Sequence, residues 1–338
     1  MGGIFISRNS NKKKDAPVKR QMQKPHIFCD FVNGVLFHGQ QRLEPEMLTR
    51  LPEGTVLELK GREGDVLRLE RMRDVIFEAA LPHKKRLIFR VILGEENQSF
   101  VDYGMVIREM GYEAGGYGEQ LRLRKLKRRE EKSLKSGDEF LSGIKKDERF
   151  VPIVNFVFYY GEREWDGSTR LLELLDIPDG EEWIYDYISD YRMNLVHAGN
   201  VQPGNFRTGL KQVFELLPFS GNEKKMEQYV ERNSREFSDV SGETFDLLST
   251  FFDSKEMNLM KRKEQFRNQE GGGYNMSTVF QRVREDGKNQ GIQIGEKKGE
   301  ERVNRLIQCL IKDCRMDEIE RVVSDRAYQK ELFQKYGI

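Results

Sequence analysis

The chain is poor in cysteine, histidine and long apolar runs, and each shortage excludes a class of protein. Its 338 residues include three cysteines and four histidines, with no CxxC pair, so neither a zinc site nor a disulfide scaffold is predicted. No apolar run approaches the roughly 18 residues of a membrane helix. The opening "MGGIFISRNSNKKKD" places its lysines after a short apolar part, unlike a secretory signal. We therefore expect no membrane contact and a reducing compartment, with the cytoplasm as the default location.

Charge is plentiful but unevenly placed. One third of the residues are charged and the formal net charge is only +1, which excludes an evenly basic nucleic-acid coat. Cations gather at residues 8–24 and 122–135, and such patches neutralise phosphates whatever the whole-chain total. The alternative is a solvated tail and a solvated loop. The candidate DNA-contacting residues of the second patch are Arg122, Arg124, Lys125, Lys127, Arg128 and Arg129.

The order of hydrophobic patterns predicts an α/β protein. Residues 1–25 lack a hydrophobic period and predict a disordered basic tail. A short helix begins after Pro25, strands are predicted near 55–61, 73–80, 85–98 and 151–160, and an amphipathic helix ends near Gly115 and Gly116, followed by a basic loop. Helix, strands, helix and strand in this order predict a domain at 26–200 with a mixed central sheet flanked by helices.

Strand patterns stop near residue 200, so an all-helical C-terminal region is expected. We predict a helical subdomain at 201–268, a glycine-rich linker at 269–276 and C-terminal helices at 277–338 that could mediate homo-oligomerisation. Gly287, Gly291, Gly295 and Gly299 recur every four residues. They fit either close approach of two helices or a flexible polar linker.

Acidic and amide side chains are placed where two predicted strands meet. Glu96 and Gln98 are two residues apart in one strand and so face the same way. A hairpin with residues 73–80 could bring Asp74 beside Glu96, and two close carboxylates repel each other unless a cation lies between them. Oxygen ligands with open positions suit Mg²⁺ or Mn²⁺, which predicts phosphodiester hydrolysis. Gln98 would orient the attacking water, and Asp30, on the polar stripe of the first helix, could be a further acid. The alternative is exposed acids at strand ends.

Several segments in order carry a family resemblance: "FCDFVNGVLFHGQ" at 28–40, "RD" at 73–74, "GEENQSFVDYGMVIREMGYEAGGYGEQ" at 94–120 and "EFLSGIKKDERFVPIVNFVFYYGEREWDG" at 139–167. With them the chain resembles the recombination-promoting nuclease and putative transposase (Rpn) family, a branch of the PD-(D/E)XK superfamily. The glycine-every-four segment and the closing "YQKELFQKYGI" are similar to that family's tail.

The resemblance implies a PD-(D/E)XK-like core and a Mg²⁺- or Mn²⁺-dependent DNA endonuclease, linked to recombination or mobile elements. It matches Asp74 and Glu96 to the family's two strand carboxylates and Gln98 to a position held by Lys in most of the superfamily and often by Gln in this branch. It also implies the main-chain carbonyl of Asn97 as a metal ligand and Asp30 as an acid on the first helix. Glu95 departs from the family, because an apolar residue is expected before the Glu.

Two other functions remain open. One is a catalytically inactive nucleic-acid-binding or interaction protein that keeps the nuclease fold. The other is a transposase that performs strand transfer with three acids on an RNase H-like fold. Gln98, on the same strand face as Glu96, favours the nuclease fold over the RNase H-like fold.

Overall fold

The computed structural model describes residues 16–51, 54–60, 66–72, 74–82, 88–252 and 273–338. The chain divides into two compact units, Met1–Asn275 and Met276–Ile338. This division falls within the predicted linker at 269–276, of which residues 269–272 lie outside the described residues. No helix in the described ranges is long and apolar enough to cross a membrane.

A five-stranded mixed sheet lies at the centre of the first unit. Its strands are rich in Val, Ile, Leu and Phe, which suit a buried pleated surface. In spatial order they are β1 (Leu48–Arg50), β4 (Val75–Pro82), β5 (Ile88–Gln98), β6 (Ile153–Tyr159) and β7 (Leu195–Val196). The first three strands pair antiparallel, and the last three pair parallel. The mixed sheet is therefore confirmed, and the predicted hairpin is confirmed for its described strands, Val75–Pro82 and Ile88–Gln98.

Two further strands form a separate antiparallel pair, β2 (Gly54–Lys60) with β3 (Val66–Met72). β2 was expected, whereas β3 was not. In its sequence "VLRLERM", apolar and charged residues alternate over Leu67, Arg68, Leu69 and Glu70, a pattern that is typical of strands.

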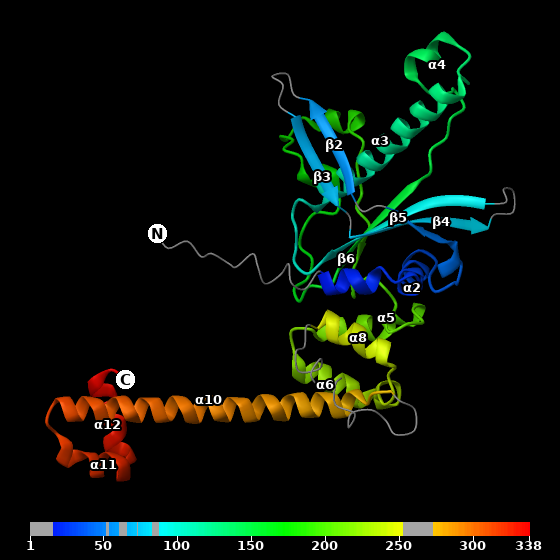
Figure 1. Cartoon of the computed structure of the whole chain (residues 1–338). Coiled ribbons are helices and arrows are strands. Elements are labelled where there is room, and N and C mark those ends of the chain that lie inside the picture. Colours follow the sequence, from blue (N-terminus) through cyan, green and yellow to red (C-terminus); the bar gives the residue numbers. More distant parts are fainter. Residues whose placement is uncertain (1–15, 52–53, 61–65, 73, 83–87, 253–272) are drawn as a thin grey trace. The chain divides into compact units, whose positions relative to one another are not determined.

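Helices cover both faces of the sheet (Figure 1). On one face lies α2 (Pro25–Leu36), whose Phe28 contacts Phe77 at a centroid distance of 4.8 Å, while its Phe31 lies 5.8 Å from Phe156. On the other face α3 (Met105–Glu131) packs its first turn, Met105 and Val106, onto the sheet in one buried cluster. Because neighbouring strand residues alternate between faces, each residue of β5 is assigned to the α2 face or the α3 face.

The helical segment after residue 200 packs on the α2 face. Phe158 of β6 contacts Phe214 at 5.2 Å and Phe251 at 5.4 Å. The predicted boundary at residue 200 therefore does not separate two compact units. The helices here are α5 (Leu210–Leu216), α6 (Glu223–Arg232), α7 (Ser234–Phe237) and α8 (Gly242–Phe251). Short 3₁₀ turns are η1 (Pro45–Met47), η2 (Leu171–Leu174), η3 (Glu182–Tyr187), η4 (Pro203–Asn205) and η5 (Leu217–Phe219).

The predicted basic loop is helical, which corrects the expected helix end near Gly115 and Gly116. Helix α3 continues to Glu131 and ends on Lys132 at φ 50°. Its second half, "LRLRKLKRREE", consists of good helix formers. Ion pairs one turn apart support it, such as Arg122 with Glu119. A short helix, α4 (Gly137–Ser142), follows.

The predicted disordered tail at 1–25 is wrong for its last part. Residues 16–22 are helical, and the side chains of Val18 and Met22 are fully buried. Residues 1–15 lie outside the described residues. The apolar residues are too few to form a visible period, but they are spaced four apart, so they share one helical face.

The second unit is built on one long helix, α10 (Met276–Lys312), followed by η7 (Met316–Glu318), α11 (Ile319–Ser324) and α12 (Arg326–Tyr336). Leu306, Leu310, Val322 and Leu332 form its core. The four glycines lie inside α10, so the linker alternative is wrong. A Cβ added at Gly291, Gly295 or Gly299 would meet no atom within 4 Å, so no described part of the chain packs closely on those three.

Candidate active site

Asp74 and Glu96 face each other across the β4–β5 hairpin. Val75 pairs with Glu95, so Asp74, one residue earlier, lies opposite Glu96. The main-chain N–H of Asn97 donates a hydrogen bond to Oδ2 of Asp74 at 3.0 Å. Residues opposite each other in an antiparallel pair share a face of the sheet, so both carboxylates belong to the α3 face.

The Glu96 carboxylate is 5 % exposed and asymmetrically bonded. Its Oε1 accepts hydrogen bonds from Arg108 of α3, from Nε2 of Gln98 at 3.3 Å and from the Tyr112 hydroxyl at 3.5 Å. Its Oε2 and the side-chain oxygen of Gln98 are buried with no hydrogen-bond partner in the described part of the chain. The structure thus brings Asp74, Glu96 and Gln98 together and leaves two buried oxygens of this group unsatisfied.

Burial and a neighbouring acid raise the pKa of the Glu96 carboxyl group. Burial is the largest cause and the Asp74 charge the next, and together they raise the pKa of Glu96 to about 8 despite the opposing charge of Arg108. A carboxyl group held in this way is readily protonated near neutral pH. An additional cation would favour its ionised form.

Arg108 and Tyr112 both belong to the site. Sequence reasoning missed Arg108 and favoured a core position for Tyr112. Arg108 also donates to Oδ2 of Asp102 at 2.7 Å and to the Tyr112 hydroxyl at 3.2 Å. Residues four apart on a helix are neighbours, and both lie on the face that carries Met105. No sequence signal pointed to this face, because the amphipathic pattern of Tyr103, Val106, Ile107 and Met110 indicated another side of the helix, and Tyr103 and Ile107 are exposed in the structure.

Glu95 and Asn97 belong to the α2 face. Glu95 is 1 % exposed, and its Oε2 accepts a hydrogen bond from Nδ2 of Asn97 at 3.0 Å. Burial, with Asp74 and Glu96 nearby, raises the pKa of Glu95 well above its ordinary value. Glu95 is thus a buried acid in the packed layer under α2, and its side chain belongs to the opposite face from the Glu96 carboxylate.

Asp30 does not belong to the group formed by Asp74, Glu96 and Gln98. It belongs to α2, and its carboxylate accepts hydrogen bonds from the main-chain N–H of Arg207 at 2.9 Å, from that of Thr208 at 2.8 Å and from the Thr208 hydroxyl at 2.6 Å. The polar stripe of α2 therefore ties this helix to the turn before α5. Within the described residues, no group of three His, Cys, Asp or Glu is arranged to hold a metal ion.

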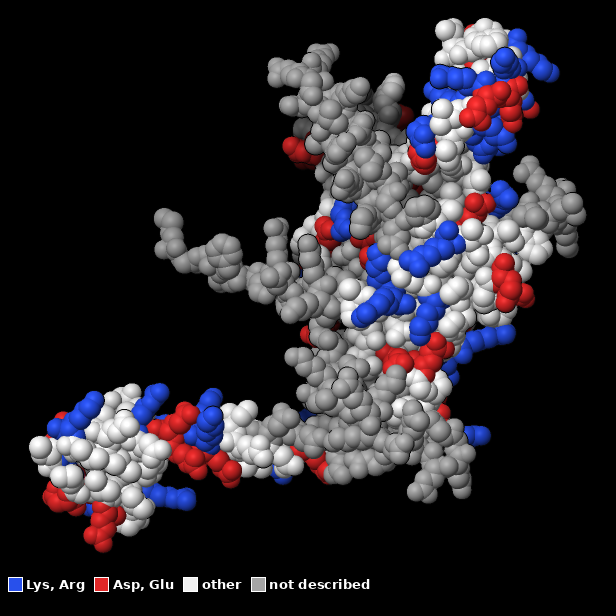
Figure 2. Space-filling view, viewed as in Figure 1, with Lys and Arg blue, Asp and Glu red and all other residues white. Residues whose placement is uncertain are grey.

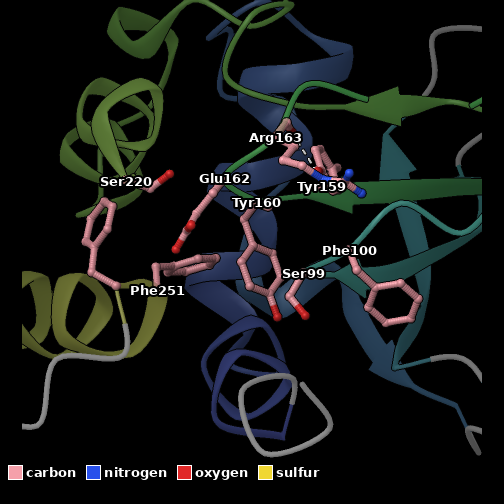
Figure 3. A pocket seen from close by; sticks show the side chains of 10 residues that line it. Ser99, Phe100, Tyr159, Tyr160, Glu162, Arg163, Ser220 and Phe251 are labelled. Atoms are coloured by element: carbon pink, nitrogen blue, oxygen red, sulfur yellow. Dashed lines mark hydrogen bonds between the residues drawn. The ribbon is translucent and has the colours of Figure 1, made fainter. Parts of the chain in front are cut away.

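A cavity of about 370 Å³ opens at the carboxyl ends of β5 and β6. Its lining comes from segments far apart in sequence, including Ser99, Tyr160, Arg163 and Phe251 (Figure 3). The Tyr159 hydroxyl donates to the main-chain carbonyl of Arg163 at 2.6 Å, which closes the turn after β6. Its lining begins at Ser99, one residue after Gln98, and includes none of Asp74, Glu96 and Gln98.

The predicted DNA-contacting residues lie on the second half of α3, and many are paired. Arg124 and Arg128 both contact Glu148, at 2.9 Å each. Arg122 pairs with Glu119, and Lys127 with Glu131. In the described ranges, no ion pair involves Lys125, Arg129 or Lys132. Figure 2 shows Lys and Arg gathered around this part of the surface.

A mixed sheet between helices, with an Asp opposite a Glu-x-Gln strand end, defines an α/β nuclease-like fold. A sequence model described as "Putative transposase, YhgA-like" matches residues 15–208, just over half of the chain. The protein belongs to this family, which is the Rpn branch of the PD-(D/E)XK proteins, so the predicted family and fold class are confirmed. No match to the chain was found among curated proteins or among solved structures.

Proposed function

We propose that the protein is a divalent-metal-dependent endonuclease that hydrolyses phosphodiester bonds in DNA, in the service of recombination or of a mobile element. The observation that carries this proposal is the opposed pair of Asp74 and Glu96 on one face of the sheet, with buried oxygens of Glu96 and Gln98 unsatisfied among the described residues. Membership in a transposase-like family supports DNA as the substrate.

The residues present fit one Mg²⁺ or Mn²⁺ ion. The donors are the Asp74 carboxylate, the free Oε2 of Glu96 and the main-chain carbonyl of Asn97. The N–H and C=O groups of one strand residue point to the same side, and the N–H of Asn97 points to Asp74. These are hard oxygen ligands, which Mg²⁺ and Mn²⁺ prefer. Such an ion, when bound, lowers the pKa of a bound water and stabilises charge on phosphate oxygens.

The side chains around the acids have distinct tasks. The N–H of Asn97 orients Asp74, and Arg108 fixes Oε1 of Glu96 so that Oε2 is left for the ion. The side-chain amide N–H of Gln98 donates a hydrogen bond to Glu96. The side-chain oxygen of Gln98 can accept a hydrogen bond from the attacking water. An amide carries no charge, so its help is positional, unlike that of Lys.

A catalytically inactive DNA-binding protein is the second candidate, and the Arg108 contact favours it. The guanidinium already supplies one positive charge to Glu96, which lessens the need for a metal ion. Plasmid nicking separates the two functions. We expect nicking with Mg²⁺ or Mn²⁺ and none with EDTA, while DNA binding without metal-dependent nicking would establish the inactive protein.

We also propose a cytoplasmic protein that associates with itself through the C-terminal helices. The thiols of Cys29, Cys309 and Cys314 are free, which suits a reducing compartment. The uncovered glycine face of α10 offers a surface for a second copy.

The salt dependence of DNA binding tests the basic half of α3. Each cation that contacts a phosphate contributes about 0.9 to the slope of log affinity against log salt. Replacing Lys125, Arg129 and Lys132 together with Ala is expected to reduce that slope by about two to three, measured by fluorescence anisotropy on a short duplex. Arg122→Ala, whose residue is paired with Glu119, is the control and should change the slope less. An unchanged slope in the triple variant would remove this half of α3 from the interface.

Metal affinity should depend on pH through Glu96. Its pKa is about 8, and the proton must leave before an ion binds. We expect Mn²⁺ affinity to rise about tenfold per pH unit below pH 8 and to level off above it, as measured by electron paramagnetic resonance of free Mn²⁺. A flat profile between pH 6 and pH 8 would contradict the placement of the ion on Glu96.

A further inference from the structure

The end of α3 and the helix after it present two large apolar side chains to solvent. We define the α3–α4 tip as residues 119–150. In it Phe140 is 67 % exposed and Leu141 is 90 % exposed. Both line a hollow of about 520 Å³, together with Lys125, Arg129 and Lys132.

These two side chains are exposed on a fixed backbone. The carboxylate of Glu139 accepts hydrogen bonds from the main-chain N–H of Lys135 at 2.7 Å and from that of Lys146 at 3.1 Å, and Ser136 completes a capping box with it. Helix α4 ends at Gly143, where an added Cβ would lie 3.0 Å from Lys125. Polar contacts therefore fix the backbone of this segment. Its two apolar side chains remain exposed, and no described part of the chain covers them.

The surroundings of the apolar pair are cationic. Residues 119–150 contain eleven Lys or Arg against seven Asp or Glu. Of the four cations that line the hollow, Lys125, Arg129 and Lys132 make no ion pair in the described ranges, while Arg128 pairs with Glu131 and Glu148. In Figure 2 the end of this projection is white and Lys and Arg gather just below it. Exposed apolar side chains beside cations that make no ion pair match a polyanion that has a stacked apolar interior.

We propose that the α3–α4 tip inserts Phe140 and Leu141 between base pairs of duplex DNA from the minor groove, and so bends the duplex. Apolar wedges of Phe or Leu that partly unstack a base step act in this way in proteins that bend DNA. Lys125, Arg129 and Lys132 hold the phosphates on either side of the inserted pair. The inference rests on the proposed function, since it takes DNA as the ligand, and it adds how the duplex is held and deformed.

The experiment measures bending separately from binding. The full-length chain carries Glu96→Gln throughout, so the DNA stays intact. A 30-base-pair duplex with a donor and an acceptor dye at its ends reports the end-to-end distance by energy transfer. We expect the tip-intact chain to increase the transfer. Phe140→Ser with Leu141→Ser should abolish that increase, weaken binding about tenfold, in line with the loss of base stacking, and leave the salt slope unchanged.

Matched variants separate the apolar from the cationic contribution. Tyr187→Ser removes a side chain that is 81 % exposed at a site outside the tip, and it should leave bending unchanged. Lys125, Arg129 and Lys132 changed to Ala should lower the salt slope. Because Phe140 and Leu141 lie in solvent, their replacement should not alter the thermal unfolding midpoint, which is measured alongside.

Four results would overturn the inference. Bending that persists in the Phe140 and Leu141 variant, while the chain still binds DNA, removes the wedge and leaves the proposed function intact. Tip-dependent co-sedimentation with phosphatidylserine vesicles, without bending, would assign the tip to a membrane surface. Tip-dependent self-association in sedimentation velocity, again without bending, would assign it to a second copy. Absence of any DNA binding by the tip-intact chain would overturn this inference and the DNA substrate together.

Discussion

Glu96→Gln is expected to lower the rate of Mg²⁺-dependent plasmid nicking about a thousandfold, whereas Glu95→Gln should leave it within a few-fold of wild type. The two residues are neighbours in β5, both are buried, and both substitutions keep the size of the side chain. They differ in face, because Glu96 lies opposite Asp74 and beside Gln98, while Glu95 bonds to Asn97 under α2. A thousandfold loss equals about 4 kcal/mol of transition-state stabilisation, within the range of a lost metal contact.

The control variant makes the outcome decisive. Burial raises the pKa of Glu95 well above its ordinary value, which favours its uncharged form, so an amide of the same size is a close substitute. Thermal unfolding of both variants checks that each remains folded. Equal losses of nicking in the two variants would mean that packing of β5, and not a metal ligand, controls the activity. Full nicking by Glu96→Gln would end the hydrolase proposal.

Asp30→Ala is expected to lower the free energy of unfolding by about 3 kcal/mol without a specific loss of nicking. The substitution removes the acceptor for the N–H groups of Arg207 and Thr208 and for the Thr208 hydroxyl. Each buried donor left without a partner costs about 1–3 kcal/mol. Urea unfolding followed by circular dichroism gives the change in stability. Asp30→Asn, which keeps one acceptor oxygen, should cost less.

The same pair of variants tests the sequence-based role of Asp30 as a catalytic acid. Nicking is compared at a temperature where both variants are fully folded. If nicking falls a hundredfold or more while the free energy of unfolding is unchanged, Asp30 acts on the substrate and the structural role assigned to it here is wrong.

The sheet and the acid pair could be predicted because both follow from local pattern. Alternation along residues 85–98 puts Glu96 and Gln98 on one face, and a short connection between apolar segments implies a hairpin, which brings Asp74 opposite Glu96. No local pattern of this kind predicts where α3 ends. Gly115 and Gly116 weaken a helix locally, but the residues after them favour it, and Gln120 anchors the middle of the helix to the main chain of Val151 at 2.8 and 2.9 Å.

Long-range partners explain the rest of what was missed. Asp30 accepts hydrogen bonds from Arg207 and Thr208, which lie 177 and 178 residues away in the sequence. No residue near Asp30 in the sequence predicts these donors. Arg108 reaches Glu96 only because α3 crosses the end of β5. The buried side of α3 also carries Glu109, so a charged residue there is no clear signal, and its partner is known only from the fold.

The continuity of α3 sets a length scale for the molecule. One helix carries Arg108 beside the acid pair and Arg129 at the far cationic end. At about 1.5 Å of rise per residue this separation is about 30 Å along the axis, close to the length of nine stacked base pairs at about 3.4 Å each. The helix fixes this distance. Inserting one residue would both lengthen the helix and turn its far end by about 100°, so the distance and the relative direction of Arg108 and Arg129 both depend on the number of residues between them.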